Sequence, residues 1–313
     1  MNVVVLPAWE DLAIRRREWR ALADRCAALP EATPAWGIPR WRELGRGRLR
    51  AVAAAEDDGT LVGLGLFCES RAPGPKLVTA LGRLTDPVVG MLIEPGRESI
   101  ASAIVAAALG AAPAAMVIEG TDDRVLLADA AEHGLAVSSR PHTPSRLVSL
   151  AELAECSDGD DRAELRWGGD PRLETAGLEA LTRAMGLTPG PETDRCRERA
   201  FLVTVLDAFS RAGELVWPIA VDGDRVTSTS AWLVRGDRAS LWLRWSEGDS
   251  LVDVAAALDQ LEGRGVSEVV FRSGDRLAGG RGRPIGGETL LVHNRPGWHR
   301  LESLAWKMVR TPA

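Results

Sequence analysis

Residues 215–245, LVWPIAVDGDRVTSTSAWLVRGDRASLWLRW, decide the fold. Three strand-like runs lie within them, joined at Asp222-Gly223 and Arg235-Gly236-Asp237, two sequences typical of tight turns. A helical pattern follows over Leu251–Leu261, and an apolar strand pattern follows over Val266–Phe271. The sequence therefore predicts antiparallel strands that lead into a strand–helix–strand crossover.

The N-terminal half repeats this order of elements. It opens with an amphipathic helix over Glu10–Leu29, and the next segment, Thr33–Trp41, is too rich in proline for a regular element. The turn sequence Asp57-Asp58-Gly59 then joins two strands. The expected elements of this half are strands at Leu49–Ala55, Leu61–Cys68 and Leu77–Leu81, a helix at Ser99–Leu109, a strand at Ala115–Glu119, a helix at Asp123–His133, and strands at Leu135–Ser138 and Leu147–Leu150.

Two domains of one architecture are expected. The acidic, non-periodic segment Cys156–Asp161 is the clearest linker, so we place the domains at residues 1–155 and 162–313. The fold class is α/β, or equally α+β, with mixed, mostly antiparallel sheets flanked by helices. The remaining expected elements are helices at Ala163–Met185, Arg195–Ala212 and Trp298–Val309, and a strand at Thr289–His293.

The composition is that of a soluble globular protein. The 313 residues are 45% hydrophobic and 26% charged, and no apolar run of about 18 residues that could span a membrane occurs. The start of the chain lacks the basic region and the cleavage site of a secretory signal. Cys26, Cys68, Cys156 and Cys196 stand too far apart for a disulfide framework, so we expect reduced thiols in a cytoplasmic protein.

Two further features bear on mechanism. The chain has no tyrosine, so a catalytic proton must move through a carboxylate, another side chain, the backbone or water. Residues 1–50 carry ten arginines and six acids, and residues 264–313 carry nine basic residues and four acids, whereas the whole chain has a net charge of −6. The basic ends are either solvated faces or an anion site that both ends share.

Several common kinds of site have no sequence support. His133, His142, His293 and His299 lack the spacing of metal ligands, so no metal is expected. Gly63-Leu64-Gly65 lies inside a strand pattern with no helix directly after it, which argues against a dinucleotide-binding fingerprint. Neither a nucleophile elbow nor a P-loop motif occurs.

Four stretches give the chain a resemblance to a known family. They are Pro34-Ala35-Trp36 with Arg40-Trp41, Leu84-Thr85-Asp86, Phe201 and Phe209 with Gly213-Glu214-Leu215 and Val221-Asp222-Gly223, and Leu290–His293 before a basic terminal helix. With this order of elements, the chain resembles the tandem GNAT-fold acyltransferases, in particular the CelD-like acetyltransferase group and the Fem-type aminoacyl-tRNA-dependent transferases. The resemblance covers roughly residues 10–310.

The resemblance implies a donor site in the second half. In the GNAT fold, two strands diverge, the pantetheine of the donor pairs with an exposed strand edge, and the pyrophosphate lies on the N-terminus of the next helix. Glu247 and Asp249 depart from the usual basic, glycine-rich loop at this place, and they oppose a pyrophosphate. The residues that the resemblance assigns to the donor are Trp245, Ser246, Gly248, Asp249 and Ser250.

Two carboxylates are candidates for the catalytic base. Glu247 lies in the donor loop, and partial burial in a cleft raises the pKa of a carboxylate towards neutrality. Asp86 follows the third strand of the first half, where the resembling families often place an acid near the cleft between the halves. The alternatives are structural, since Asp249 or Ser250 would merely cap a helix and Asp86-Pro87 would merely start a turn.

Two groups of residues are candidates for substrate contacts. Trp36, Arg40 and Trp41 either form an aromatic and cationic wall of the cleft or belong to the core. The glycine- and arginine-rich loop after Phe271 is either solvated or an anion contact, because arginine forks match phosphate oxygens. The arginines of this loop are Arg272, Arg276, Arg281 and Arg283.

The resemblance implies transfer of an acyl group from acyl-CoA, such as acetyl-CoA, to an amine of a small molecule or peptide. The first alternative is a Fem-like transferase that uses aminoacyl-tRNA, which the basic ends would contact. The second alternative is a non-catalytic GNAT pair that binds a small molecule or a protein, which the acids of Ser246–Ser250 favour. We expect neither a membrane nor DNA as a partner.

Overall fold

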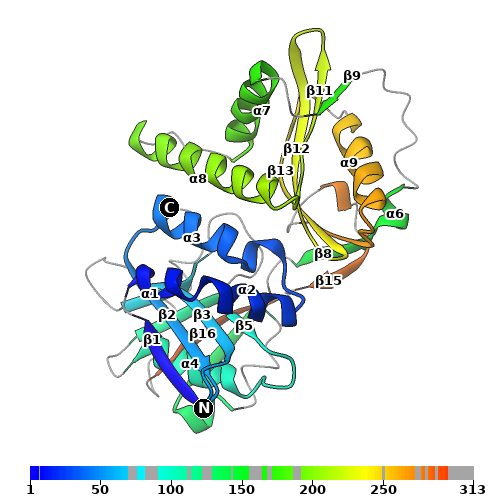
Figure 1. The fold of residues 1–313 in the computed structure, drawn as a ribbon. Helices are drawn as coiled ribbons and strands as arrows, with labels where there is room; N and C mark the ends of the chain where they lie inside the picture. Colours follow the sequence, from blue (N-terminus) through cyan, green and yellow to red (C-terminus); the bar gives the residue numbers. More distant parts are fainter. Residues whose placement is uncertain are drawn as a thin grey trace. The chain divides into compact units, whose positions relative to one another are not determined.

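The chain folds into two compact units in the computed structural model. The first contains the described residues of Met1–Ala28, Ala32–Ser145 and Ile285 onward, and the second contains those of Leu29–Glu31 and Arg146–Pro284. Each unit is a mixed sheet flanked by helices, as the sequence predicts (Figure 1). The structure describes all residues except 7, 70–75, 82–90, 111–113, 122–128, 142–143, 155–163, 168–170, 186–191, 249–250, 272–275, 279–280, 286–287 and 295–313.

The sheet of the first unit has the strand order β1-β2-β3-β4-β6-β16-β7, and β5 pairs with another part of β3. Neighbouring strands run antiparallel except β4 and β6, which run parallel. The strands are β1 (Asn2–Leu6), β2 (Arg48–Ala55), β3 (Leu61–Glu69), β4 (Lys76–Ala80), β5 (Met91–Ile93), β6 (Ala114–Thr121), β7 (Ala136–Pro141) and β16 (Glu288–His293).

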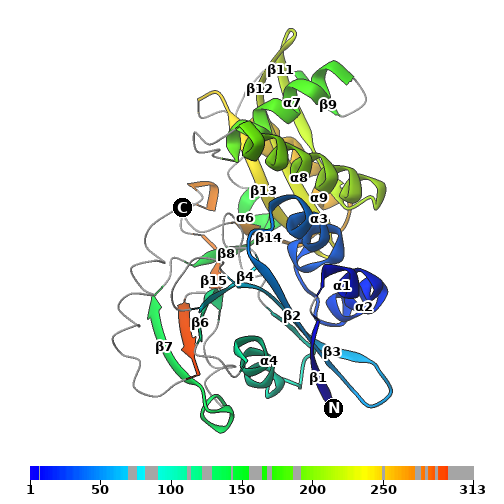
Figure 2. The same ribbon diagram turned by 90° about the vertical axis from the view of Figure 1, so that its left-hand side faces the viewer.

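Helices cover both faces of this sheet. Helix α4 (Ile100–Leu109) lies on one face of β2 and β3, and α1 (Trp9–Ile14) and α2 (Arg16–Arg25) lie on the other (Figure 2). Helix α3 (Pro34–Leu44) packs against α1 and α2. Two short 3-10 turns are η1 (Pro30–Ala32) and η2 (Ala131–His133).

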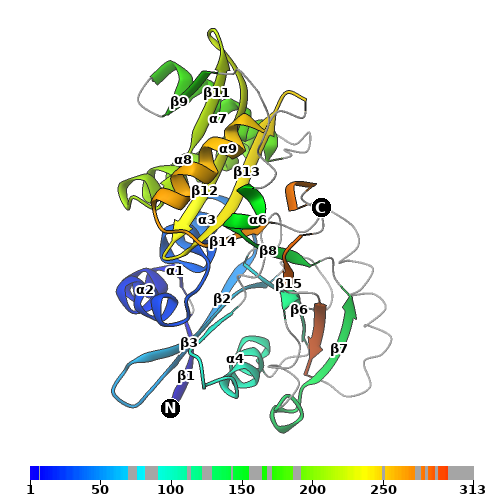
Figure 3. The same ribbon diagram turned by 90° about the vertical axis from the view of Figure 1, so that its right-hand side faces the viewer.

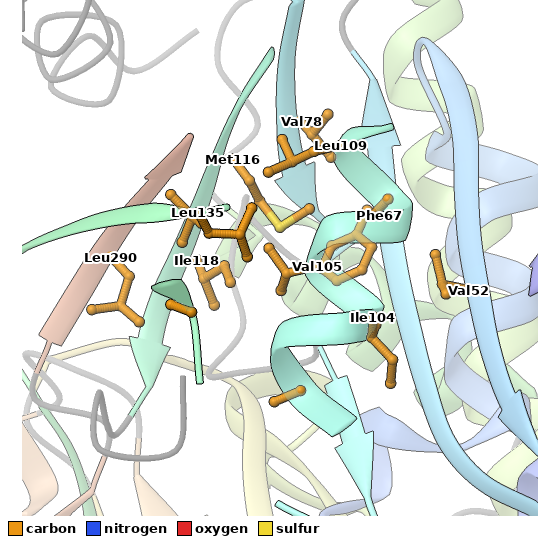
Figure 4. Packing of buried hydrophobic residues seen from close by; sticks show 14 of the residues in the cluster. Val52, Phe67, Val78, Ile104, Val105, Leu109, Met116, Ile118, Leu135 and Leu290 are labelled. Carbon is orange, nitrogen blue, oxygen red and sulfur yellow. The ribbon is translucent and has the colours of Figure 1, made fainter. Parts of the chain in front are cut away.

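The core of the first unit is apolar and lies under α4. Figure 4 shows Ile104, Val105 and Leu109 of this helix directed at side chains of β2, β3, β4, β6 and β16. The helix approaches β3 at two glycines: a Cβ on Gly65 would lie 2.6 Å from Ile104 Cγ2, and a Cβ on Gly63 would lie 2.8 Å from Ile104 Cδ1. Because side chains larger than hydrogen do not fit there, these glycines set the distance between α4 and the sheet.

The sheet of the second unit has the matching order β9-β11-β12-β13-β14-β8-β15, and β10 pairs with β12. As in the first unit, one central pair, β13 and β14, runs parallel. The strands are β8 (Ser145–Ser149), β9 (Glu164–Trp167), β10 (Leu215–Val216), β11 (Pro218–Asp222), β12 (Arg225–Arg235), β13 (Arg238–Ser246), β14 (Glu268–Phe271) and β15 (Arg283–Ile285).

The second sheet also has helices on both faces. Helix α9 (Val252–Gly263) lies on one face, and α7 (Pro171–Ala184) and α8 (Glu192–Arg211) lie on the other (Figures 1 and 3). Phe201 of α8 packs edge-on against Trp242 of β13, with 5.8 Å between the ring centroids. The short helix α6 (Leu150–Ala154) and the 3-10 turn η3 (Arg276–Ala278) complete the described elements of this unit.

Two strands pair in the sheet formed mainly by the other half of the chain. Strand β8 follows β7 closely in sequence, yet it pairs with β14 in the second sheet. Strand β16 follows β15 closely, yet it lies between β6 and β7 in the first sheet. The expected boundaries, 1–155 and 162–313, therefore do not follow the two units, because each sheet is completed by a strand from the other half. The expected linker Cys156–Asp161 lies outside the described residues.

Most of the expected elements are present, with some differences. Of the expected helix Asp123–His133, residues 123–128 lie outside the described residues and Ala131–His133 form the 3-10 turn η2. Thr33–Trp41 is not irregular, because Pro34 occupies the first position of α3, where a missing N–H costs nothing, and Gly37 lets the Trp19 ring lie against this helix. The expected helix Glu10–Leu29 is divided between α1 and α2 at Arg15. The region Ala163–Met185 is helical only from Pro171, because residues 164–167 pair with β11 as β9. The expected helix Trp298–Val309 lies outside the described residues.

Candidate functional site

The described pairing of β13 is longer on one edge than on the other, because β14 ends at Phe271 and residues 272–275 lie outside the described residues. Strand β13 pairs with β12 along its whole length, from Arg238 to Ser246. It pairs with β14 only from Arg238 to Ser240. Directly after this point, Trp242 is the extra residue of a β-bulge, which bends a strand and increases its twist. In the part of the chain that the structure describes, the segment 241–246 thus has a strand partner on one edge alone.

The hydrogen-bond alternation of β13 tells which groups face this open edge. The Glu247 N–H donates to the Thr227 carbonyl at 2.8 Å, so Glu247 is bonded to β12. Because successive residues of a strand direct their N–H and C=O groups to opposite edges, Trp245 also faces β12 and Ser246 faces away from it. The open edge therefore presents the main-chain N–H and C=O of Ser246.

Polar residues lie between β13 and α9. Arg244 forms two hydrogen bonds with Asp253 in the first turn of α9, from Nε to Oδ2 and from Nη2 to Oδ1, both at 3.2 Å. The Asp253 side chain is fully buried, and that of Arg244 is 18% exposed. On the same face, Ser230 accepts a hydrogen bond from Trp232 Nε1, and the buried Ser228 Oγ has no partner among the described residues. The polar layer contrasts with the apolar core under α4.

The opposite face of β13 carries an aromatic residue at the open end. The guanidinium of Arg183, in the last turn of α7, lies over the Trp245 ring at 5.2 Å from its centroid. Thr229, which is opposite Trp245 on β12, accepts a hydrogen bond from Trp217 Nε1 at 2.9 Å. Both tryptophans pack against the cluster of Leu173, Ala180, Ile219, Val221 and Val226.

The loop after β13 does not fit the pyrophosphate of coenzyme A. Glu247 is 39% exposed and forms an ion pair with Arg225, with 2.7 Å between Oε1 and Nη2. Asp253 already places a carboxylate in the first turn of α9. Gly248 has φ of +73° and open space around it, so it permits close backbone approach, but the described loop residues supply acids rather than cations. The described residues of this loop, Glu247, Gly248 and Leu251, include no cation, so they offer a phosphate no charged partner of their own.

The corresponding loop of the first unit does not fit a phosphate either. Its Gly96 N–H donates to Glu98 Oε1 at 2.8 Å, and this hydrogen bond holds the pKa of Glu98 below its usual value. Arg97 is paired with Glu56 at 2.6 Å. The Gly96 N–H and the Arg97 guanidinium are therefore both already bound to carboxylates of this unit, which would compete with a phosphate.

The structure brings only some of the expected site residues together. Trp245, Ser246, Glu247 and Gly248 lie at the end of β13, where the side chain of Glu247 is 39% exposed and paired with Arg225. Asp86, Asp249, Ser250 and Arg272 lie outside the described residues.

The other expected contacts have structural surroundings. Trp36 is fully buried, with the Arg40 guanidinium 5.9 Å from its ring centroid, and Trp41 is half-buried in the same helix α3. Arg281 and Arg283 are exposed, whereas Arg276 begins η3. Between Arg281 and Arg283, a Cβ on Gly282 would lie 2.3 Å from the Leu147 carbonyl oxygen, so this glycine serves packing against β8.

Sequence reasoning missed Arg183, Arg244 and Asp253. Asp253 gives only a weak sequence signal. An acid in the first turn of an otherwise apolar helix suits the helix dipole, but this does not indicate that the Asp253 side chain is buried. Arg183 gives no signal of its own, since its stacking partner is 62 positions later in the chain.

The described residues also bear on metal binding and on membrane spanning. No three His, Cys, Asp or Glu side chains there are grouped so that they could hold a metal ion. Among the same residues, no helix has the length and apolar character needed to cross a membrane.

Solved structures share this architecture along nearly the whole chain, although no family model and no curated protein matches the sequence. FemX matches over 97% of this chain and 99% of its own, with a TM-score of 0.58 and 10% identity. A tandem GNAT protein from the clavulanic acid biosynthesis pathway matches over 95% and 99%, with a TM-score of 0.52 and 16% identity. This chain has the tandem GNAT-like fold.

A third neighbour has the same fold. It is the C-terminal domain of a protein from Agrobacterium fabrum that is provisionally named a lysylphosphatidylglycerol synthetase. The match covers 95% of this chain and 97% of that domain, with a TM-score of 0.52 and 12% identity. The tandem GNAT-like fold is thus the fold of several transferases, and these identities carry the fold alone.

Proposed function

We propose that this tandem GNAT-like protein transfers an acyl group from an activated carrier to an amine at the open edge of β13. The observation that supports the proposal is the strand pairing: β13 pairs with β12 along its whole length, whereas among the described residues it pairs with β14 only from Arg238 to Ser240. An extended carrier arm that lies along this edge gains main-chain hydrogen bonds as an added strand does. No step is assigned to coenzyme A, because the start of α9 does not fit its pyrophosphate.

The proposed reaction is amide formation. The lone pair of a neutral amine forms a C–N bond with the carbonyl carbon of a thioester or an ester. The C–S or C–O bond to the carrier then breaks, the amine loses one proton to a base or water, and the carrier leaves as a thiol or a hydroxyl. Main-chain N–H groups of the open edge, such as that of Ser246, polarise the carbonyl and stabilise the oxyanion.

The roles of individual side chains are part of the same proposal. Trp245, Ser246 and Gly248 contact the donor, together with Asp249 and Ser250. Water is the simplest proton acceptor, while Glu247 can act as a base only after it separates from Arg225. Asp86 is the second candidate base. Arginines proposed for anion contacts are Arg272, Arg276, Arg281 and Arg283, and the proposed acceptor wall is Trp36, Arg40 and Trp41.

Aminoacyl-tRNA is a second candidate donor, and two observations favour it over acyl-CoA. The acids at the start of α9 oppose a pyrophosphate there, and FemX is among the structures with the same fold over nearly the whole chain. Arg16 and Arg17 of α2 are exposed and suit RNA phosphates. Binding of tRNA would then weaken steeply as salt rises.

The experiment that tests the function compares Ser246→Pro with Ser246→Ala. Proline removes the outward N–H without removing a bond to β12, whereas alanine keeps the N–H and loses only the Ser246 Oγ to Gly248 carbonyl contact of 2.9 Å. Thermal shifts and amide formation are measured with acetyl-CoA, longer acyl-CoAs and aminoacyl-tRNA.

We expect one donor class to stabilise the wild type and Ser246→Ala alike, and Ser246→Pro to bind or react about tenfold or more weakly. Equal activity of both variants would contradict a role for this edge. Stabilisation by no donor, with a folded protein, would favour the non-catalytic binding alternative.

A further inference from the structure

Arg183 differs from the other arginines around β13. Its guanidinium lies over the ring of Trp245, and its side chain is exposed. It forms no ion pair or hydrogen bond with any described residue, although Glu179 stands one helical turn earlier. By contrast, Arg225 and Arg244 are each bound to a carboxylate.

The stacking prepares this guanidinium for a ligand. A guanidinium is planar, and its N–H donors point outward in that plane. Stacking against an indole uses the face of the group and leaves the in-plane donors available. Because the ring also restricts the long side chain, less conformational entropy is lost when an anion binds.

The Trp245 ring, on which Arg183 stacks, is held in place next to the open edge. The Trp245 side chain packs against the apolar cluster between α7 and the sheet. Its cross-strand neighbour Thr229 is buried and bound to Trp217 Nε1 and to the Pro218 carbonyl. The residue after Trp245 is Ser246, whose N–H faces away from β12. A molecule held by Arg183 on the α7 face is therefore near the proposed site of acyl transfer.

We propose that Arg183, stacked on Trp245, binds an oxyanion, either a carboxylate or a phosphate, of the amine that accepts the acyl group. That the bound molecule is the acyl acceptor rests on the proposed function, whereas the presence of an oxyanion site does not. The two in-plane donors on one side of a guanidinium match two oxygens of either group. The acceptor class is thus an amine with an acidic group, such as an amino acid, a peptide end or an amino phosphate.

A purely structural role for Arg183 leads to a different expectation. A cation in the last turn of a helix is favourable beside the helix dipole, and lysine serves this purpose as well as arginine. Lysine lacks the planar fork, so it does not replace arginine in binding two oxygens. Arg183→Lys therefore separates the two roles.

The test is a titration of the full chain at constant ionic strength with three amines. Glycylglycine carries a carboxylate, phosphoethanolamine carries a phosphate, and glycylglycinamide carries neither. Binding is followed by NMR through the Arg183 Nε–H and the Trp245 Nε1–H signals, assigned with Arg183→Met and Trp245→Phe. Arg199→Met is the matched control, since Arg199 is an exposed arginine of α8 in the same unit.

We expect saturable shifts with glycylglycine, phosphoethanolamine or both, and none with glycylglycinamide. Arg183→Met should abolish the response, Arg183→Lys should weaken it about tenfold or more, and Arg199→Met should leave it unchanged. The comparison of the first two ligands tells whether the natural group is a carboxylate or a phosphate.

Three results would overturn the proposal: equal shifts with glycylglycinamide, unchanged binding in Arg183→Met or Arg183→Lys, or no saturable shift with either oxyanion. Its failure is distinguishable from failure of the proposed function. If the protein binds oxyanions but forms no amide, the proposed transferase function is contradicted and the oxyanion site stands. If Arg183→Met leaves amide formation unchanged, only the assignment of Arg183 to the acceptor is contradicted.

Discussion

The two units share one strand order but differ under the helix that follows the central strands. In the first unit, α4 packs on Gly63 and Gly65 through apolar side chains. In the second unit, α9 also packs on an apolar cluster, but its first turn carries Asp253, which is buried and paired with Arg244. The strand before the helix differs too, since β13 pairs with β12 along its whole length and has a bulge at Trp242.

This difference favours the second unit as the place of the proposed chemistry. Close glycine contacts serve packing, and they leave no space between α4 and β3. Buried ionic groups cost free energy to desolvate, so they are weak evidence for stability and are common at functional sites. The second unit therefore holds the candidate site, and the variants below test this assignment in order of expected effect.

The largest effect is expected for Asp253→Ala in the second unit. Removing this carboxylate leaves the Arg244 charge with 18% exposure and without its partner in α9. Breaking a buried pair in this way costs about 3–5 kcal/mol. Urea unfolding measures the change. The control is Asp207→Ala, which breaks the exposed pair with Arg211 and should cost less than about 1 kcal/mol. Equal small losses would show that the buried pair is not formed.

The second effect concerns strand exchange. Leu290 and Leu261 are both fully buried and both follow residue 162, yet Leu290 belongs to the first unit and Leu261 to the second. Each change to alanine should cost about 3 kcal/mol. Hydrogen exchange should show loosening of β6 and β7 in Leu290→Ala, and of β11–β13 in Leu261→Ala. Loosening of the same strands by both variants would contradict the placement of β16 in the sheet of the first unit.

A smaller effect is expected for Gly65→Ala in the first unit. The new methyl group would lie 2.4 Å from Phe67 Cε2 and 2.6 Å from Ile104 Cγ2, so α4 must move or side chains must leave their rotamers. Overpacking of this kind costs about 1–3 kcal/mol. Gly263→Ala is the control, because that position in α9 has open space. A thermal melt that shows no difference between the two variants would mean that α4 does not pack tightly on β3.

The smallest effect is a pH dependence at the start of α6, after the exchanged strand β8. Ser149 donates from Oγ at 2.9 Å and from N at 3.0 Å to Glu152 Oε2, which lowers the pKa of Glu152 from its usual 4.5. A lowered folded-state pKa gives stability above the unfolded pKa that is lost as pH falls through the folded value. Melts of wild type and Glu152→Gln should therefore differ at pH 7 and converge as the pH falls through the lowered pKa of Glu152. A pH-independent difference would contradict this.

The local elements of the fold could be predicted, but the exchange of strands could not. The apolar run within Leu49–Ala55 and the turn at Asp222-Gly223 are local signals, and both hairpins are present. Val148 and Leu290 each belong to an apolar strand pattern, and nothing local specifies which sheet such a short strand completes. Pairing with β14 or β6 depends on contacts more than 100 positions apart.

The candidate site was only partly predictable, for a similar reason. The end of β13 was expected because Trp245 precedes the helix start in the GNAT order. The role of Glu247 as a base stays a prediction, and its ion pair with Arg225 on the neighbouring strand could not be foreseen from local sequence. Arg183 and Asp253 became candidates only when the fold placed them on the two faces of β13.

Amide hydrogen exchange along β13, measured by NMR in the free protein, tests the open edge most directly. The account predicts alternation: the amides of Trp245 and Glu247, which face β12, exchange slowly, and the amide of Ser246 exchanges many times faster. Addition of the donor that the protein uses should slow Ser246 alone among the three. Equal protection of all three amides without any ligand would mean that this edge is closed, and it would contradict the account.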